Sequence, residues 1–355
     1  MRMGRQLGSL QGRWHYAAVR TALAAALVLA GGVTPIAQTS AVIKLASVVP
    51  ENSIWDKNLK QMAAEWNQAT GGRVSVTVFS GGTQGDEPTV LRKMRVDALQ
   101  AASLTVVGLG TIDASFNVFN VPFFFESYDE LNDVQAKLTP EISKRVEAKG
   151  FVLLNWGHGG WTQVFTKKPV RTLDELKKTK LWTSAGSDRM VQWFKANGFE
   201  PRAMAMTDIM TGLTTGMIDA VPTTPLAAML FQWNRQTPNM IDIGLAPVIG
   251  ATVVSRKTWN KIPAADRPKL LAAAAGVQKR LEADVPKQDA AAIAAMKKSG
   301  LTVTEATSPE WRQPLDALAK TMRGEMVPPD IFDLAVKARD AYRKRPSPQA
   351  AGPAK

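Results

Sequence analysis

Apolar and polar positions in the first part of the chain follow strand and helix periods in turn. AVIKLASVV from Ala41 has the continuous apolar character of a buried strand, and the next segment places Leu59, Met62 and Trp66 at helical spacing. RVSVTVF then alternates as a strand does, a second helix follows, and LQAASLTVVGL, residues 99–109, is predicted to be another strand. Strands that alternate with helices predict an α/β fold with a mainly parallel sheet.

The same order of elements recurs in the second part of the chain. Thr172 and Glu175 form a capping box for a short helix, and KLWTS, residues 180–184, is predicted to be a strand. Further helices and strands follow, and from Ala264 onward the chain is helical and alanine-rich, with a further helix expected from about Pro286. The pattern therefore predicts two similar α/β lobes.

The two ends of the chain differ in composition from the rest. The first 20 residues hold four arginines and no acidic residue, and the apolar run TALAAALVLAGG follows, which is typical of a secretory signal peptide. An uncleaved anchor is the alternative. The end, RKRPSPQAAGPAK, is basic and rich in proline, which predicts disorder. The predicted parts are a signal peptide at 1–41, lobe I at 42–165 and 250–290, lobe II at 166–249 and 291–335, and a disordered basic tail at 336–355.

Charge and cysteine content exclude several classes of function. The net charge is +13, and removal of the four arginines in the signal leaves +9. These charges are spread along helices and form no basic stripe interleaved with aromatic residues, so nucleic-acid binding is not expected. The chain has no cysteine, which excludes disulfides, thiolate metal sites and a cysteine nucleophile.

The motifs of common enzymes are missing as well. His15 and His158 are the only histidines, and His15 would leave with the signal, so no histidine-based zinc site is expected. His158 in WGHGGW is interpreted as a loop or hinge residue. There is no GxSxG elbow and no Walker loop. We therefore expect a protein with no enzymatic activity, no metal and no cofactor.

An ordered series of segments resembles the solute-binding proteins of TRAP transporters. It runs from VVPENSIWDKNLKQMAAEW through FNVFNVPFFFES and FTKKPVRTLDELKKTKLW to ANGFEPRAMAMTDIMTGLTTGMIDAVPTTPL, over roughly residues 42 to 335. The resemblance implies a periplasmic receptor with two α/β lobes that close like a clamshell, chain crossovers that serve as a hinge, and a long helix that spans both lobes. It also implies a small-molecule ligand between the lobes and membrane subunits as partners. We expect the receptor to be a monomer.

The sequence departs from the family pattern where the family binds its ligand. Members usually carry an arginine that grips the ligand carboxylate at the position that falls on Trp182, and a second arginine at the position of Gln163. Thr224 takes the place of the usual asparagine before proline. An indole cannot offset the cost of desolvating a carboxylate, but it offers roughly 150 to 250 Å² of apolar contact. The resemblance with these departures predicts a neutral or largely hydrophobic solute, one that could be lipid-like.

The predicted ligand-binding residues combine apolar walls with polar side chains that would orient the solute. Phe123, Phe125 and Trp156 are further aromatic candidates, although aromatic residues in this region can equally form the lobe core. The predicted site comprises Trp182, Gln163, Thr183, Thr223, Thr224, Met206, Trp161, Ser103, Thr105 and Phe124.

Two alternatives stay open at the level of the sequence. Arg189 or Arg202 could reach the cleft and restore carboxylate binding, which would make the protein an ordinary organic-acid receptor. A periplasmic binding protein that reports ligand state to a sensor is the alternative from another class.

Overall fold

The computed structural model describes residues 41–186 and 188–345. Residues 1–40 of the predicted signal peptide and the last ten residues of the predicted tail lie outside these ranges. Among the residues described, no helix has the length and apolar character needed to cross a bilayer.

Lobe I is built around a five-stranded sheet with the strand order β2-β1-β3-β10-β4. β1 pairs in parallel with β2 and β3, while β10 is antiparallel to β3 and β4. The expectation of a mainly parallel sheet is therefore wrong for this lobe, because β10 enters from the other lobe and runs in the opposite direction. The strands are β1 Ala41–Ser47, β2 Val74–Phe79, β3 Ala101–Thr105, β4 Phe151–Trp161 and β10 Pro247–Ser255.

The helices of lobe I follow the predicted pattern except after β3. The predicted strand over 99–109 ends at Thr105, where its hydroxyl caps a helix by accepting a hydrogen bond from Val107 N at 3.3 Å. A short apolar run fits a buried helix as well as a strand, so its periodicity could not decide between them. The helical segments are α2 Ile54–Ala69, α3 Glu87–Arg95, α4 Val106–Ile112, η1 Ala114–Asn120, α5 Tyr128–Ala148 and α10 Arg256–Lys261.

Lobe II is built around a six-stranded sheet with the order β11-β9-β5-β8-β6-β7. The predicted strand KLWTS is β6, and it pairs in parallel with β7 and β8. β5 is antiparallel to both of its neighbours, so this sheet is mixed too. The strands are β5 Gln163–Thr166, β6 Lys180–Ser184, β7 Glu200–Met204, β8 Ala220–Thr223, β9 Asn239–Asp242 and β11 Thr302–Glu305.

Short helices connect the strands of lobe II. The predicted cap before the first of them is confirmed, since Thr172 Oγ1 accepts a hydrogen bond from Glu175 N at 3.2 Å. Gly216 ends α8 in the left-handed conformation that favours glycine. The helical segments are α6 Leu173–Lys177, α7 Asp188–Ala196, η2 Met206–Asp208, α8 Ile209–Thr215, α9 Pro225–Leu230 and η3 Trp233–Arg235.

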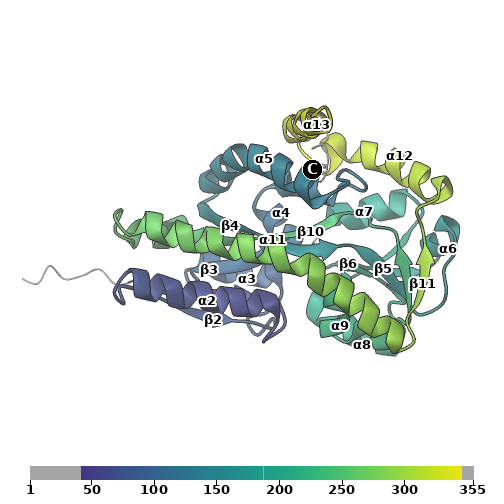
Figure 1. Cartoon of the computed structure of the whole chain (residues 1–355), viewed down its shortest axis with the longest axis horizontal. Helices are drawn as coiled ribbons and strands as arrows, with labels where there is room; N and C mark the ends of the chain where they lie inside the picture. The colour runs from purple at the N-terminus through teal and green to yellow at the C-terminus, as the bar shows by residue number, and fades with distance from the viewer. Residues whose placement is uncertain (1–40, 187, 346–355) are drawn as a thin grey trace, which may run out of the picture. The chain divides into compact units, whose positions relative to one another are not determined.

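Three segments join the two lobes. β4 leads into β5 through Thr162, and the return from β9 to β10 passes beside it, because Thr162 N donates to Ala246 O and Leu245 N donates to Thr162 O. The third is α11, Arg267–Lys298, which packs on α2, β4 and α9 (Figure 1). The predicted new helix at Pro286 is wrong, since α11 continues through that proline and through the predicted lobe boundary at residue 290.

Two helices complete the described chain. α12, Pro309–Glu325, bends at Arg323 and Gly324, and α13, Pro329–Arg343, packs against α5. The prediction that a disordered tail begins at residue 336 is therefore wrong up to Arg343. Apolar positions at Ile331, Ala335 and Ala338 give α13 a buried face that holds it on lobe I.

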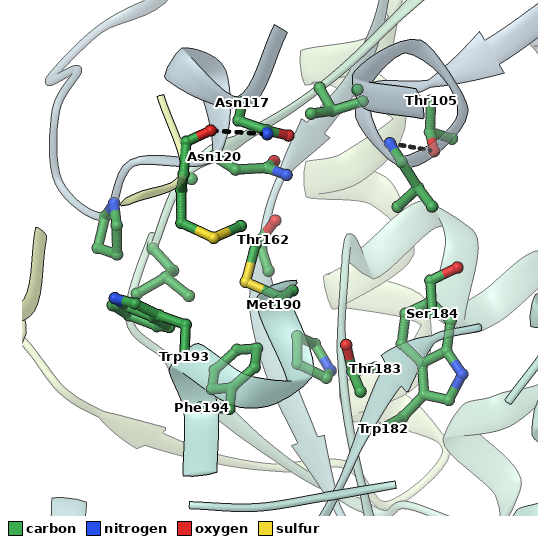
Figure 2. Close-up of a pocket in the computed structure, with 18 of the residues that line it drawn as sticks. Thr105, Asn117, Asn120, Thr162, Trp182, Thr183, Ser184, Met190, Trp193 and Phe194 are labelled. Atoms are coloured by element: carbon green, nitrogen blue, oxygen red, sulfur yellow. Dashed lines mark hydrogen bonds between the residues drawn. The ribbon is translucent and has the colours of Figure 1, made fainter. Parts of the chain in front are cut away.

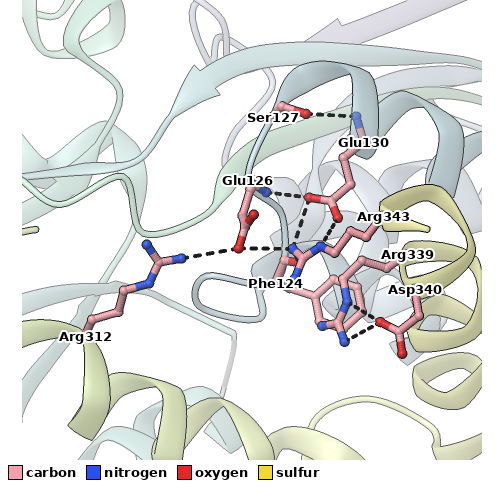
Figure 3. Close-up of polar contacts among 8 residues, drawn as sticks. All are labelled: Phe124, Glu126, Ser127, Glu130, Arg312, Arg339, Asp340 and Arg343. Atoms are coloured by element: carbon pink, nitrogen blue, oxygen red, sulfur yellow. Dashed lines mark hydrogen bonds and ion pairs between the residues drawn. The ribbon is translucent and has the colours of Figure 1, made fainter. Parts of the chain in front are cut away.

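Ion pairs hold the two last helices to the start of α5. Arg343 binds the buried carboxylate of Glu130 at 2.5 Å, and it also approaches Glu126, which pairs with Arg312 on α12 (Figure 3). The guanidinium of Arg339 lies 4.5 Å from the centre of the Phe124 ring. These ion pairs hold α12 to lobe I, in addition to its packing on lobe II.

Candidate functional site

A cavity of about 590 Å³ opens between the two lobes. This volume falls in the range of pockets that hold small organic molecules, roughly 300 to 1,000 Å³. Lobe I contributes residues from α4 and from η1, and lobe II contributes β6 and α7 (Figure 2). Residues of α12 add a further wall. The crossover residues Thr162 and Ala246 also line it, so both lobes and the segments that join them surround the cavity.

A buried carboxylate supports the lobe I side of the cavity. Glu87 accepts hydrogen bonds from Thr105 N at 2.6 Å, Thr105 Oγ1 at 2.8 Å and Gly108 N at 2.8 Å. Burial raises the pKa of Glu87 to about 7, against the opposing effect of these hydrogen bonds. The hydroxyl of Thr105 is engaged with Glu87 and with the first turn of α4, so Thr105 shapes the cavity wall.

Trp182 lines the cavity as predicted, but its polar atom is already bonded. The indole Nε1 donates a hydrogen bond to Met204 O at 3.2 Å, and the ring packs on the side of lobe II that holds Ile209 and Leu213. The ring therefore offers the solute an apolar surface and no hydrogen bond. Met206 lies in the same apolar group and also lines the cavity.

Hydroxyl and amide side chains form part of the cavity lining. Thr183 and Thr223 are both buried and line the cavity. Asn117 Nδ2 donates to Met326 O at 2.9 Å, which ties η1 to the chain between α12 and α13 (Figure 2). Thr183 and Thr223 are thus the predicted residues best placed to bond a polar group of a solute.

One arginine lines the cavity, and its side chain is exposed. Arg189, in the first turn of α7, is the only lysine or arginine among the described residues that line it, and Asp188 is the only acid. The positive end of the α7 dipole adds to the charge of the guanidinium at this point. Arg202, the other arginine considered from the sequence, lies on β7 outside the lining and pairs with Glu200 at 3.4 Å.

A second, smaller cavity adjoins the first. It measures about 130 Å³ and is lined by Ser103 and Thr224, two more of the predicted site residues. Thr105, Met206 and Thr223 line both cavities, so the two are neighbours. Thr224 Oγ1 accepts a hydrogen bond from Ala227 N at 3.3 Å, which makes it the cap of α9.

Three predicted site residues do not line either cavity. Gln163 Oε1 accepts hydrogen bonds from Ile243 N at 2.7 Å and Gly244 N at 2.9 Å, so its amide fixes the crossover after β9. Trp161 packs beside Tyr128, with ring centres 5.7 Å apart, and Phe124 is buried in the core of lobe I. Their placement as solute contacts is corrected, because each is occupied by packing or backbone contacts elsewhere.

Two of the other aromatic candidates, Phe125 and Trp156, belong to the core of lobe I, as the alternative interpretation held, while Phe123 packs against the core of lobe II. Phe125 and Trp156 are buried, and Trp156 packs edge-on against Phe119 with ring centres 5.3 Å apart. Phe123 is half-buried, and its ring lies 5.1 Å from the guanidinium of Arg312.

Sequence reasoning missed the wall made by α7 and α12. Met190, Trp193 and Phe194 of α7 line the cavity, and Leu315 and Met322 of α12 face it from the other side. The helical spacing of the α7 residues was visible in the sequence, but it is equally typical of a core face. The position of α12 beside the cavity depends on a contact between residues more than 120 positions apart in the sequence. In this contact Trp193 Nε1 donates a hydrogen bond to Thr321 Oγ1 at 2.9 Å.

Two buried titratable groups lie under the crossover. His158 is part of β4, where it pairs with Ile249, and is not in a loop as predicted. Burial lowers its pKa to about 4, so it is uncharged near neutrality. Burial raises the pKa of Asp289 on α11 to about 6, and its carboxylate accepts a hydrogen bond from Leu226 N at 2.8 Å. Across residues 41–186 and 188–345, no group of three or more His, Asp or Glu side chains could hold a metal ion.

Similar proteins place this geometry in a known context. A solute-binding protein of Chromohalobacter salexigens is 28% identical over 46% of this chain and 49% of its own length. The C4-dicarboxylate-binding periplasmic protein DctP of Rhodobacter capsulatus is 24% identical over 85% of this chain and 91% of its own. The crystal structure of a TRAP periplasmic solute-binding protein from Xanthobacter autotrophicus Py2 with bound β-D-galacturonate superposes with a TM-score of 0.78 and 19% identity. That superposition covers 84% of this chain and 99% of the other.

The structural similarity confirms the expected fold of two α/β lobes with a long helix between them. The family model for DctP, described as bacterial extracellular solute-binding protein, family 7, matches residues 45–325. Its members are receptors and not enzymes. With a match over that much of its length, and with a solute-sized cavity between its lobes, this chain belongs to the family 7 bacterial extracellular solute-binding proteins.

Proposed function

We propose that this protein is the periplasmic receptor of a TRAP-type uptake system and that it captures an organic acid. Arg189 is the observation that carries the proposal. A carboxylate enclosed between two lobes loses several kcal/mol of hydration unless a charged hydrogen-bonding partner replaces the water. Arg189 is the one cationic side chain in the described lining, and a guanidinium can bind both carboxylate oxygens.

The ligands named for similar proteins support the same chemistry. The Rhodobacter capsulatus relative is named for C4-dicarboxylates, and the Xanthobacter autotrophicus structure holds a galacturonate. Both ligands carry a carboxylate. The expectation of a neutral solute therefore gives way to its alternative, in which an arginine at another position replaces the one lost at Trp182.

The charges around Arg189 favour an acid with a single carboxylate. Asp188 lines the same cavity and lies next to Arg189 in the chain. A second carboxylate on the solute would find no second cation in the described lining and would be repelled by Asp188. Thr183 and Thr223 can donate to the carboxylate or to a neighbouring polar group of the solute.

Closure of the two lobes around the acid would produce the form of the receptor that the membrane subunits recognise. A ligand that contacts both lobes shifts the equilibrium towards the closed form. The closed receptor then presents its solute to membrane subunits as a monomer in the periplasm, after cleavage of the signal peptide. The paired crossovers at Thr162 and Ala246 and the continuous helix α11 are the segments that this motion would bend.

Calorimetry on two arginine variants tests the proposal. Hexanoate, succinate and D-glucuronate are titrated into the mature protein, with hexanamide as the uncharged comparison. Arg189→Gln is expected to weaken the best acid by about 2 kcal/mol, roughly thirtyfold in Kd, since it removes a charge-assisted hydrogen bond. Arg202→Gln, a matched change outside the cavity, is expected to leave the affinity unchanged. Equal binding of the acid and its amide, or unchanged binding by Arg189→Gln, contradicts the proposal.

A further inference from the structure

Part of the cavity is lined by apolar side chains, and we call this part the apolar branch. Beyond the polar residues Thr183 and Ser184, its lining passes to Trp193 and Phe194 on α7, on the other side of the cavity (Figure 2). Phe199 and Leu176 of lobe II continue that lining, and Leu315, Met322 and Met326 close it from α12 and the turn that follows. The branch is therefore bounded by lobe II and α12, and Trp193, Met322 and Met326 also pack on the core of lobe I.

The side chains that define the branch offer no polar group to a solute. The one polar atom of Trp193 is turned outwards, because its Nε1 donates to Thr321 Oγ1 at 2.9 Å. Trp193 and Phe194 meet edge to face with ring centres 5.4 Å apart, and Phe194 meets Phe199 in the same way at 5.4 Å. A sugar hydroxyl placed here would lose its hydrogen bonds to water and gain none, while a hydrocarbon would lose nothing.

An apolar space of this kind is unusual for a void left by packing. Protein interiors are packed like organic crystals, and voids larger than a water molecule are few. Leu315 and Met322 are 5% and 1% exposed, yet both line the cavity, so the opening extends into the protected interior. Enclosed spaces lined by apolar side chains bind apolar groups.

Helix α7 aligns the branch with the charged end of the site. Arg189 lies in its first turn and Trp193 lies four residues on, about 6 Å further along the helix axis at 1.5 Å per residue. One helix thus carries both the guanidinium and the start of the apolar wall. A molecule with a carboxylate at Arg189 would direct its other end along α7 towards α12.

We propose that this branch is a binding site for the hydrocarbon tail of the solute, which makes the ligand an amphiphilic monocarboxylic acid with an alkyl or aryl-alkyl tail. The inference rests on the proposed function, since Arg189 must hold the acid end. Four methionines line the cavity, Met190, Met206, Met322 and Met326. Methionine side chains adapt to irregular shapes, so the site accepts tails that differ in shape and selects for their length and apolar character.

The test uses linear acids of increasing length, butanoate, hexanoate, octanoate and decanoate, with D-glucuronate and succinate as polar acids. Each added methylene is expected to tighten Kd by about fourfold until the branch is full, the equivalent of about 0.8 kcal/mol per buried methylene. D-glucuronate is expected to bind more weakly than hexanoate. Affinity that is independent of tail length, or that falls with length from butanoate onward, overturns the inference.

Variants at Leu315 separate a tail site from general packing. Leu315→Trp is expected to weaken octanoate at least tenfold and to leave butanoate unchanged, whereas Leu315→Ala moves the best tail length upward. Leu318→Ala is the matched control, because Leu318 lies on the same helix and does not line the cavity. Opposite shifts for the two Leu315 variants support the tail site, and an unfolded Leu315→Trp leaves the Leu315→Ala shift as the deciding result. Unchanged length preference in Leu315→Ala overturns it.

Failure of the inference is distinguishable from failure of the proposed function. If D-glucuronate or succinate binds through Arg189 but tailed acids do not, the receptor is an acid receptor without a tail site. If none of the acids binds, the proposed function itself fails.

Discussion

Gly186, in the loop before α7, faces Pro88 at the start of α3 so closely that a Cβ on Gly186 would lie 2.8 Å from Pro88 Cγ. The two residues belong to different lobes, so this is a point where the lobes touch beside the cavity. Gly82 lies equally close to Thr207, since a Cβ on Gly82 would be 2.8 Å from Thr207 Cγ2. Small residues at both points let the lobes approach each other.

Substitution of Gly186 by alanine should therefore weaken solute binding. The new Cβ would hold Pro88 away and raise the free energy of the closed form, so the Kd for octanoate is expected to rise about tenfold by calorimetry. Gly216→Ala is the control: Gly216 has a similar positive φ, but a Cβ there meets nothing within 4 Å. It should lower stability by about 1 kcal/mol through backbone strain, with unchanged affinity. Equal affinity losses in both variants would mean that strain, and not contact between the lobes, explains the result.

Trp182 predicts a change of solute class. Trp182→Arg would place a second cation in the cavity, at the position where similar receptors are expected to carry one. We expect D-glucuronate to bind at least tenfold tighter than to the wild type and octanoate to bind more weakly, because apolar contact is lost. Trp182→Phe keeps the apolar surface and removes only the hydrogen bond to Met204, so it should cost about 1 kcal/mol of stability with little change in solute preference. If Trp182→Arg leaves the preference between D-glucuronate and octanoate unchanged, Trp182 does not contact the solute.

Glu87 predicts a pH dependence of stability. Its pKa is raised by burial to about 7 from an ordinary value of 4.5, so between these pH values the folded state holds a proton that the unfolded state releases. The contribution of Glu87 to the free energy of unfolding is fully present below about pH 4.5. It decreases as the pH rises to about 7 and is constant above that pH. Asp289 acts in the same direction and His158 in the opposite one, so the informative quantity is the difference between variant and wild type.

Glu87→Gln removes the ionisation at this position. The variant should gain about 1 kcal/mol or more relative to the wild type as pH rises from 4.5 to 7.5, measured by urea unfolding. Glu147→Gln changes an exposed glutamate and should show no such trend. A flat difference for Glu87→Gln would show that its carboxyl titrates as it does in the unfolded chain.

The Arg343 contact predicts that α13 is part of the fold. Arg343→Ala would leave the carboxylate of Glu130, 2% exposed, without its cation. We expect a loss of about 2 kcal/mol of unfolding free energy, since hydrogen bonds to charged groups contribute about 1.5 to 3 kcal/mol. Arg345→Ala breaks a more exposed pair with Asp133 and should cost less than about 1 kcal/mol. If both variants lose the same small amount of unfolding free energy, the Arg343 contact contributes no more to stability than an exposed ion pair.

Local patterns predicted much of the fold because they are recorded in adjacent residues. The alternation in β2 and the cap at Thr172 each need only a few neighbouring positions to be recognised. The continuation of α11 through Pro286 was not predictable in this way, because packing on both lobes overrides the local cost of a proline. The end of the fold was also misplaced, since the burial of α13 depends on its contact with α5.

The site was predicted less completely than the fold. Trp182 was selected because the family resemblance implies a ligand-binding position there, and Trp182, Thr183 and Thr223 line the cavity. Gln163 was misplaced because the sequence does not show that its amide bonds two backbone N–H groups. Arg189 was an open alternative, and the α12 wall was missed, because side-chain direction and distant contacts decide both.

Native mass spectrometry of the receptor isolated from the periplasm tests the central claim most directly, since it identifies the molecule that fills the cavity. We predict one bound compound that carries a single carboxylate and a hydrocarbon tail, and that is absent when Arg189→Gln is isolated in the same way. A bound neutral lipid or a polyhydroxylated acid, or a tailed acid retained equally by Arg189→Gln, would contradict the account.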